Sequence, residues 1–273
     1  MIIEPAFLQA GSNNFYPSCF TASLKNFMKL KWFLALLVIH TFIQLPAQQT
    51  GDPKLTEIWK PVPKIISPGA TSTDAPSDAI ILFNGKDASA WQNKNGTAFN
   101  WKVADNAVTV VPKAGDIQTK EGFGDCQLHI EWRTPAEVNG EGQGRGNSGI
   151  FLMSRYELQV LDSYNNTTYS NGQAGSIYKQ HMPQVNVCRP PGQWQTYDII
   201  FIAPQFYEDS TLKSPARITV IQNGVLIQNN VELWGPMQFI GVPKYEKHSN
   251  KEPLLLQDHG NTVSYRNIWL RPL

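Results

Sequence analysis

The alternation of apolar and polar residues over short stretches is the feature that most constrains the fold of this chain. It is clearest from Cys126 to Arg133, where every second side chain is apolar. Successive side chains of a strand point to opposite faces, so this stretch predicts a strand with one face in a hydrophobic core and the other toward water or a ligand. No stretch of the sequence shows a sustained helical period, and we therefore expect an all-β protein.

Turn signals separate further short stretches of this kind. Asp105-Asn106 and Asn223-Gly224 each lie between two apolar stretches and predict hairpins. The chain also has 20 glycines, 19 prolines, 8 tryptophans, 9 tyrosines and 13 phenylalanines, a composition that suits strands and turns. About a dozen short strands joined by long loops predict a jelly-roll sandwich of two packed antiparallel sheets.

The first part of the sequence has the layout of a signal peptide. Two lysines precede an apolar run from Trp32 to Ile43, and Leu-Pro-Ala follows. The run is too short for a stable membrane span, so we expect cleavage after Ala47 and export to the periplasm or the medium, with no span in the mature form. An uncut signal-anchor helix is the alternative. The predicted organisation is an upstream extension from a start codon assigned too early (1–27), a signal peptide (28–47), an extended Pro-rich lead-in (48–78) and a jelly-roll catalytic domain (79–273).

Charge and cysteine content restrict the ligands and cofactors. The net charge is +1 and 16% of residues are charged, so no nucleic-acid partner is expected and the ligand should be neutral or weakly charged. No zinc-ligand spacing or calcium loop occurs, so no metal or other cofactor is predicted, although a calcium bound by backbone carbonyls stays open. In an exported protein Cys126 and Cys188 could form a disulfide or remain two separate buried thiols.

The segment from Arg145 to Tyr164 is predicted to carry the functional site. A turn-forming Gly-Asn-Ser-Gly at 146–149 precedes one apolar run, and a second strand-like run follows from Tyr156. In that second run Glu157 and Gln159 share one face. Asp162 does not fit this alternation unless a β-bulge intervenes.

The spacing of Glu157, Gln159 and Asp162 resembles the Glu-x-Asp-x-x-Glu strand of laminarinase- and lichenase-type glucanases, in which a bulge turns both outer acids into one sugar-binding cleft. Here Gln replaces the middle acid and Asp the last one. Double displacement needs two carboxyls at a fixed short separation, so the spacing predicts a cleft on a concave sheet and not that mechanism. The alternative is that Glu157 and Gln159 form a solvated strand face.

Several motifs from Ala79 to the C-terminus keep one order along the chain. They are ILFNGKDASAW from Ile81, LHIEWRTP from Leu128, GNSGIFL from Gly146, YELQVLDSY from Tyr156, GSIYKQ from Gly175, PPGQWQTYDIIF from Pro190 and QDHGNTVSYRNIWLRPL from Gln257. Together they resemble the 3-keto-disaccharide hydrolase domain family, a concanavalin-like sandwich of secreted bacterial proteins that is frequent in Bacteroidetes. The resemblance implies a glucanase-like jelly roll that hydrolyses glycosides already oxidised to a ketone at C3, so the expected partner is an oxidised disaccharide or glycoside.

Such chemistry needs a base, an acid and donors for an enolate. A C3 ketone acidifies the hydrogen on C2, so its removal allows the glycosidic oxygen to leave C1, and water then adds back. The predicted catalytic residues are Glu157, Asp162 and His259, and the predicted substrate-binding residues are Arg145, Asn147, Gln159 and Lys179. His129 and His181 rank lower. The competing interpretations are a carbohydrate-binding sandwich without catalysis and an endo-glucanase-like glycoside hydrolase, against which the Gln at 159 counts.

Overall fold

The computed structural model describes residues 51–273, which belong to two units that divide after Pro63. The described part of the first unit contains one 3₁₀ turn, η1 (Pro53–Thr56), whose first turn is capped by the Asp52 carboxylate accepting from the Lys54 amide at 3.0 Å. The described residues do not include the predicted signal peptide, the alternative anchor helix or the upstream extension. Within 51–273, no helix has the length and apolar character needed to cross a bilayer.

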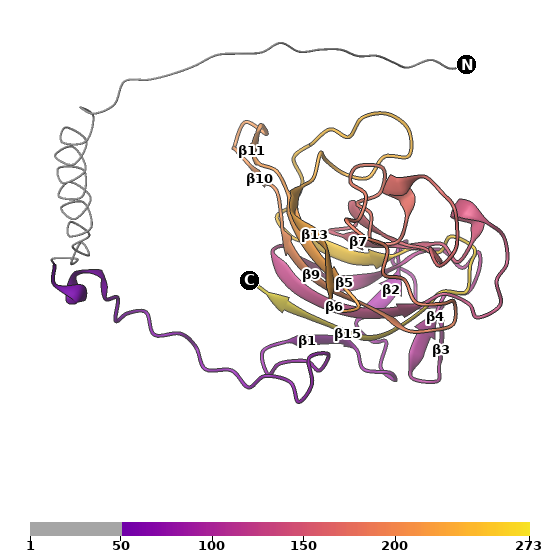
Figure 1. The fold of residues 1–273 in the computed structure, drawn as a ribbon, viewed down its shortest axis with the longest axis horizontal. Helices are drawn as coiled ribbons and strands as arrows, with labels where there is room; N and C mark the ends of the chain where they lie inside the picture. Colours follow the sequence, from indigo (N-terminus) through magenta and orange to yellow (C-terminus); the bar gives the residue numbers. More distant parts are fainter. Residues whose placement is uncertain (1–50) are drawn as a thin grey trace, which may run out of the picture. The chain divides into compact units, whose positions relative to one another are not determined.

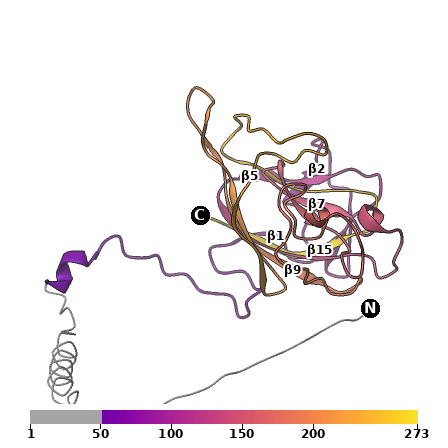
Figure 2. The same cartoon turned by 45° about the horizontal axis from the view of Figure 1, so that its top comes forward.

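The second unit is a sandwich of two antiparallel sheets, seen as separate layers in Figure 2 and with strand labels in Figure 1. The larger sheet runs in the order β13-β12-β9-β6-β15-β4-β3, with β1 also paired to β15, and the smaller one in the order β2-β5-β14-β7-β8. The larger sheet consists of β1 (Ile80–Phe83), β3 (Lys102–Ala104), β4 (Ala107–Thr109), β6 (Cys126–Arg133), β9 (Gln195–Ile202), β12 (Arg217–Gln222), β13 (Val225–Glu232) and β15 (Ser264–Pro272). The smaller sheet consists of β2 (Trp91–Asn93), β5 (Ile117–Phe123), β7 (Ser148–Leu152), β8 (Tyr156–Val160) and β14 (Glu252–Leu256). The all-β jelly-roll sandwich predicted from the sequence is confirmed.

Three smaller elements complete the unit. A separate hairpin, β10 (Gln205–Phe206) with β11 (Leu212–Ser214), projects from the sandwich in Figure 1. Two further 3₁₀ turns, η2 (Gly142–Gly144) and η3 (Ser170–Gly172), lie in the loops before β7 and after β8. These loops border the candidate site.

The hydrophobic core lies between the two sheets. From β6 it receives Cys126, Leu128, Ile130 and Trp132, the apolar face predicted from the alternation, and β8 contributes Leu158 to the same cluster. Burying each large apolar side chain stabilises the fold by roughly 1.5–3 kcal/mol, so this layer fixes the positions of both sheets.

The middle of the opposite face of β6 is also buried, at His129 and Glu131, although the sequence predicted that this face would meet water or a ligand. His129 stacks on Trp269 with ring centroids 5.3 Å apart, and its Nδ1 lies 2.6 Å from Asp198 Oδ1. Burial by itself lowers the pKa of His129, but the hydrogen bond to Asp198 and the Glu131 carboxylate 3.8 Å from Nε2 outweigh it and raise the pKa to about 9. His129 therefore belongs to a buried ionic network, which agrees with its low rank as a catalytic candidate.

Both predicted hairpins form as expected. Asp105 (φ 53°), Asn106 (φ 59°) and Asn223 (φ 51°) adopt the left-handed conformation that tight hairpin turns require, and Asn and Asp tolerate it best among side-chain-bearing residues. The cysteines remain two free thiols, with Cys126 buried and Cys188 partly buried, so the disulfide considered from the sequence does not form.

Candidate active site

The β7–β8 pair places two polar side chains on the outer face of the smaller sheet. Its antiparallel register sets Glu157 opposite Phe151 and Gln159 opposite Gly149. Leu158 belongs to the hydrophobic core, so the alternation of the strand turns Glu157 and Gln159 away from that core. Both are nevertheless buried, which rules out the solvated strand face considered from the sequence.

The bulge suggested by the glucanase-like spacing is absent from this pair. The register of β7 and β8 is continuous, and β8 ends at Val160. Asp162 therefore lies in the segment after the strand, where the chain no longer alternates. The acid that the spacing placed beside Glu157 is instead buried next to Arg145.

Glu157 and Gln159 line a hollow of about 230 Å³ with residues from distant parts of the chain. Its lining combines the polar residues Asn147, Glu157, Gln159, Gln257 and His259 with Tyr178, Met237 and Phe239. The structure thus brings together four of the seven residues predicted from the sequence. Pockets for drug-sized ligands span roughly 300–1,000 Å³, so this hollow suits a single sugar ring and not an oligosaccharide.

Gly149 makes room for the Glu157 carboxyl group. A Cβ atom at this glycine would lie 2.7 Å from Glu157 Oε1 and 2.7 Å from Phe151 Cε2, closer than non-bonded atoms approach. The carboxyl therefore lies directly over the backbone of the neighbouring strand. The Gly-Asn-Ser-Gly sequence before β7 thus contributes space as well as a turn.

The Glu157 carboxyl is buried without a cationic partner. It is 4% exposed, and burial, followed by repulsion from Asp116, raises its pKa to about 8. No lysine or arginine of residues 51–273 forms an ion pair with it. Near neutral pH this group holds a proton that it can release and take up, as an acid or base in catalysis must.

Neutral amides surround this carboxyl. The Gln159 amide has two usable orientations: in one its Nε2 donates to Gln143 Oε1 at 3.1 Å, and in the other it donates to the Ser148 carbonyl at 3.0 Å and to Glu157 Oε1 at 3.2 Å. Asn147 Nδ2 donates one hydrogen to the Gln143 carbonyl at 2.7 Å and retains a second. Gln257 Oε1 is buried and has no hydrogen-bond partner among the described residues. These amides can bind a carbonyl oxygen and hydroxyl groups.

His259 comes from a loop whose shape is set by the preceding residue. Asp258 accepts hydrogen bonds from the backbone amides of Gly260 (2.9 Å) and Gly115 (3.0 Å), and its own amide donates to Asp116 Oδ1 at 3.0 Å. The exposed imidazole of His259 lines the hollow. Glu157 lies deep in the site and His259 lies near its mouth.

Lys179, predicted as a substrate-binding cation, contacts Phe239 on the apolar side of the site. Its Nζ donates to the Phe239 carbonyl at 2.7 Å and lies 4.0 Å from the centroid of the Phe239 ring. It is not among the lining residues, unlike its neighbour Tyr178, whose hydroxyl pairs with that of Tyr169 at 2.5 Å. Burial raises the pKa of Tyr178, so its phenol stays neutral.

Arg145 and Asp162 lie together in a second hollow of about 270 Å³. Arg145 Nε donates to Asp162 Oδ2 at 2.7 Å, and its Nη2 donates to the Tyr164 carbonyl at 2.8 Å. Asp162 is 4% exposed and paired with Arg145, so it is placed to hold this segment of the chain. Arg145, predicted to bind substrate, and Asp162, predicted to be catalytic, line this second hollow and do not line the Glu157 hollow.

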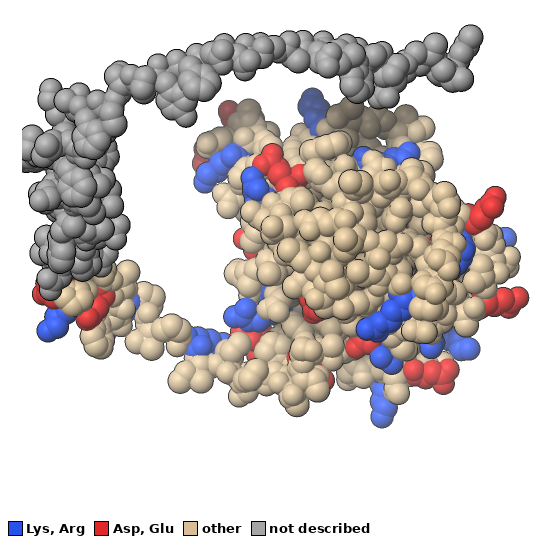
Figure 3. Space-filling model, in the orientation of Figure 1, with Lys and Arg blue, Asp and Glu red and all other residues tan. Residues whose placement is uncertain are grey.

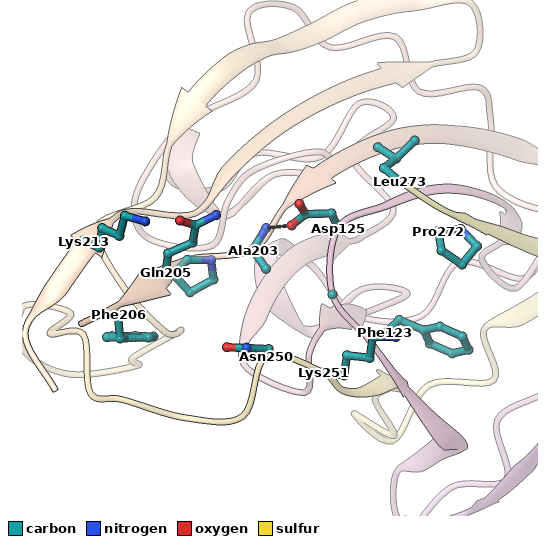
Figure 4. A pocket seen from close by; sticks show the side chains of 12 residues that line it. Phe123, Asp125, Ala203, Gln205, Phe206, Lys213, Asn250, Lys251, Pro272 and Leu273 are labelled. Atoms are coloured by element: carbon teal, nitrogen blue, oxygen red, sulfur yellow. Dashed lines mark hydrogen bonds between the residues drawn. The ribbon is translucent and has the colours of Figure 1, made fainter. Parts of the chain in front are cut away.

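A larger hollow, of about 430 Å³, is drawn in Figure 4 and lies near the start of β14. The Glu157 hollow lies near the end of the same strand. Its Asp125 carboxylate accepts from the Ala203 amide at 2.7 Å, a bond drawn in Figure 4. Its lining contains lysines but no histidine or glutamate. Residues 51–273 also contain no group of three His, Cys, Asp or Glu side chains that could hold a metal ion.

On the face shown in Figure 3, lysine and arginine side chains are interspersed with aspartate and glutamate. This face carries no extended patch of one sign. Recognition there would depend on hydrogen bonds and shape more than on charge.

Comparison with known proteins places this geometry in a family. The chain is 50% identical to a protein of known structure from Parabacteroides distasonis, provisionally named a glycosyl hydrolase, over 81% of this chain and 97% of that one, with a TM-score of 0.78. A second Parabacteroides distasonis protein with the same provisional name shares the fold at 21% identity and a TM-score of 0.52, over 71% of this chain and 94% of that one. No curated protein matches the chain. The first similarity supports a carbohydrate-active enzyme, and the second shows the fold alone.

Residues 78–271 match the sequence profile of a single domain family. This range includes every residue that lines the Glu157 hollow. The chain belongs to the family of 3-keto-alpha-glucoside-1,2-lyase-like domains.

Proposed function

We propose that this protein is an exported hydrolase that cleaves 3-keto-glycosides, including 3-keto-disaccharides, by elimination followed by hydration. The observation that carries the proposal is the Glu157 hollow: a ring-sized site with one buried carboxyl, one imidazole and several neutral amides. The family description, a lyase-like domain for 3-keto-alpha-glucosides, supports the same chemistry.

The reaction proceeds through an enolate. A base removes the hydrogen on C2 of the keto sugar, and the electrons of that bond form an enolate with the C3 carbonyl. The enolate then expels the glycosidic oxygen from C1, which takes up a proton and leaves as an alcohol. Water adds to C1 of the resulting enone and a proton returns to C2, so the products are the free 3-keto sugar and the alcohol. No nucleophile from the protein attacks C1.

Glu157 is placed to act as the base. A carboxylate whose pKa is raised to about 8 binds a proton more tightly than an ordinary carboxylate, which suits removal of a weakly acidic C–H. His259, near the mouth, is placed to give a proton to the leaving oxygen. The amides of Asn147, Gln159 and Gln257 supply donors for the enolate oxygen, in place of the cations Arg145 and Lys179 expected from the sequence.

The lining of the hollow disfavours an ordinary glucanase. Retaining glycosidases need two carboxyls about 5–5.5 Å apart, and inverting ones about 6.5–9.5 Å. Of the described residues that line the hollow, Glu157 alone carries a carboxyl. An elimination needs no second carboxyl, so the site fits the keto-sugar reaction better.

The test compares a plain and an oxidised substrate. We expect the purified protein to release sugar from 3-keto-trehalose and not from trehalose, and Glu157→Gln to abolish the release. In D₂O, the wild type should place deuterium at C2 of the keto sugar, and this exchange should also vanish in the variant. Cleavage of plain trehalose without exchange would refute the elimination. Binding of the keto sugar without turnover in either form would indicate a carbohydrate-binding sandwich.

Export is part of the same proposal and rests on the signal-peptide pattern at residues 28–47. Expressed with its full leader in a bacterium of the Bacteroidetes type, the protein should be recovered outside the cytoplasm. Its N-terminus should be Gln48. Recovery of an uncut chain in the membrane fraction would favour the signal-anchor alternative.

A further inference from the structure

The Glu157 hollow has two walls of different chemistry. The amides, Glu157 and His259 form the polar part of its lining, and Tyr178, Met237 and Phe239 form the part that we call the apolar wall. The apolar wall continues outward into a group of exposed side chains that we call the apolar tip: Phe239, Ile240 and Val242, which are 64%, 83% and 81% exposed. Large apolar side chains gathered in this way next to a ligand site mark a binding surface.

The loop that carries the tip is held in position by hydrogen bonds near its base. The Met237 amide donates to the Arg155 carbonyl at 2.8 Å, and Gln180 Nε2 donates to the Gly235 carbonyl at 2.9 Å. The Trp234 amide in turn donates to Gln180 Oε1 at 2.7 Å. Together with the Lys179 bond to Phe239, these contacts present the apolar side chains at the mouth before any ligand arrives.

From this geometry we infer that the preferred substrates are 3-keto-glycosides with an apolar or aromatic aglycone, which lies against Phe239 and the apolar tip while the keto sugar fills the hollow. The inference rests on the proposed function and extends it to the leaving group. The hollow has room for one ring, so the leaving group must extend through the mouth, where Phe239 is the lining residue that continues into the tip. A second sugar there would place its hydroxyl groups against the apolar side chains of the tip, whereas a phenyl or alkyl group would bury those side chains.

The test uses two substrates whose leaving alcohols have similar chemical reactivity: the 3-keto derivatives of 2-phenylethyl glucoside and methyl glucoside, each as both anomers. For the wild type we expect kcat/KM to be at least about tenfold higher for the phenylethyl compound. Phe239→Ala should reduce this preference by about three- to tenfold, and Ile240→Ser, whose side chain is not part of the hollow, should also reduce it. Val225→Ala, an exposed apolar residue on the β12–β13 hairpin, is the matched control and should leave the preference unchanged.

The outcomes separate the inference from the function on which it rests. If methyl and phenylethyl substrates are cleaved equally well, or if Phe239→Ala slows both by the same factor, the aglycone assignment is refuted and the proposed function stands. If neither oxidised glycoside nor 3-keto-trehalose is cleaved, the proposed function itself fails. Self-association of the wild type that is lost in Phe239→Ala, without any aglycone preference, would identify the apolar tip as a contact between copies and would also refute the inference.

Discussion

Replacing Glu157 by Gln should stabilise the protein at alkaline pH and leave its stability nearly unchanged at acidic pH. Folding raises the pKa of Glu157 from 4.5 to about 8, so between these values the folded protein holds a proton that the unfolded chain releases. The stability that depends on this proton is complete below pH 4.5 and is lost as the pH rises through about 8. At 1.36 kcal/mol per pH unit, the difference between these two pKa values lowers the free energy of unfolding by roughly 3–5 kcal/mol at pH 9.

A glutamine of the same shape cannot ionise and escapes this loss. The difference in Tm between Glu157→Gln and the wild type should therefore be near zero at pH 5 and reach roughly 6–20 °C at pH 9, given 2–4 °C per kcal/mol for a domain of this size. Thermal unfolding followed by circular dichroism at several pH values measures it, with the exposed Glu121→Gln as the matched control. An equal difference at pH 5 and pH 9 would show that the carboxyl of Glu157 titrates normally and would remove the physical basis for its role as the base.

Further predictions concern activity and the neighbouring ion pair. The kcat/KM for a 3-keto-glycoside should rise with pH with an apparent pKa of about 8, because Glu157 must be ionised to act as the base. A kcat/KM that does not change from pH 5 upward would contradict this prediction. Gly149→Ala should lower kcat by at least about tenfold and destabilise the fold by roughly 1–3 kcal/mol, because the added methyl group would displace the Glu157 carboxyl. If this variant keeps the wild-type kcat, the carboxyl does not lie as close to the β7 backbone as the structure indicates. Asp162→Asn should destabilise the protein by roughly 3–5 kcal/mol, measured by urea unfolding, because it leaves Arg145 without its charged partner. A large loss of kcat in the folded variant would instead support the catalytic role predicted for Asp162 from the sequence.

The parts of the fold that the sequence predicted are those with local signals. The strand at 126–133 alternates strictly, and the Asn223-Gly224 turn encodes its own hairpin. By contrast, β5 (Ile117–Phe123) was not predicted, because its sequence IQTKEGF contains two charges and a glycine. It becomes a strand through pairing with β2 and β14, and β14 lies more than a hundred residues away. Such pairing leaves no pattern inside the seven residues themselves.

The same distinction applies to the site. Alternation within one strand correctly put Glu157 and Gln159 on one face and left Asp162 out of it. The glucanase-like spacing does not add Asp162 through a bulge, because the strand ends two residues earlier. Met237 and Phe239 carried no signal in the sequence. They reach the hollow through a loop that is positioned by hydrogen bonds to Arg155 and Lys179. Gln257 belonged to a motif noted in the sequence, yet only the structure places it in the lining of the hollow, with a buried oxygen that has no partner among the described residues.

The apolar wall links recognition to the strength of the base. Met237 and Phe239 line the hollow that holds Glu157, and burial is the main cause of its raised pKa. Truncating Phe239 should therefore admit water to the carboxyl as well as weaken aglycone binding, so the rising limb of the kcat/KM profile should move toward lower pH in Phe239→Ala. A change in aglycone preference without such a shift would mean that the deeper residues alone keep water from Glu157. A shift for substrates of every aglycone would show that one loop sets both the specificity and the basicity of the site.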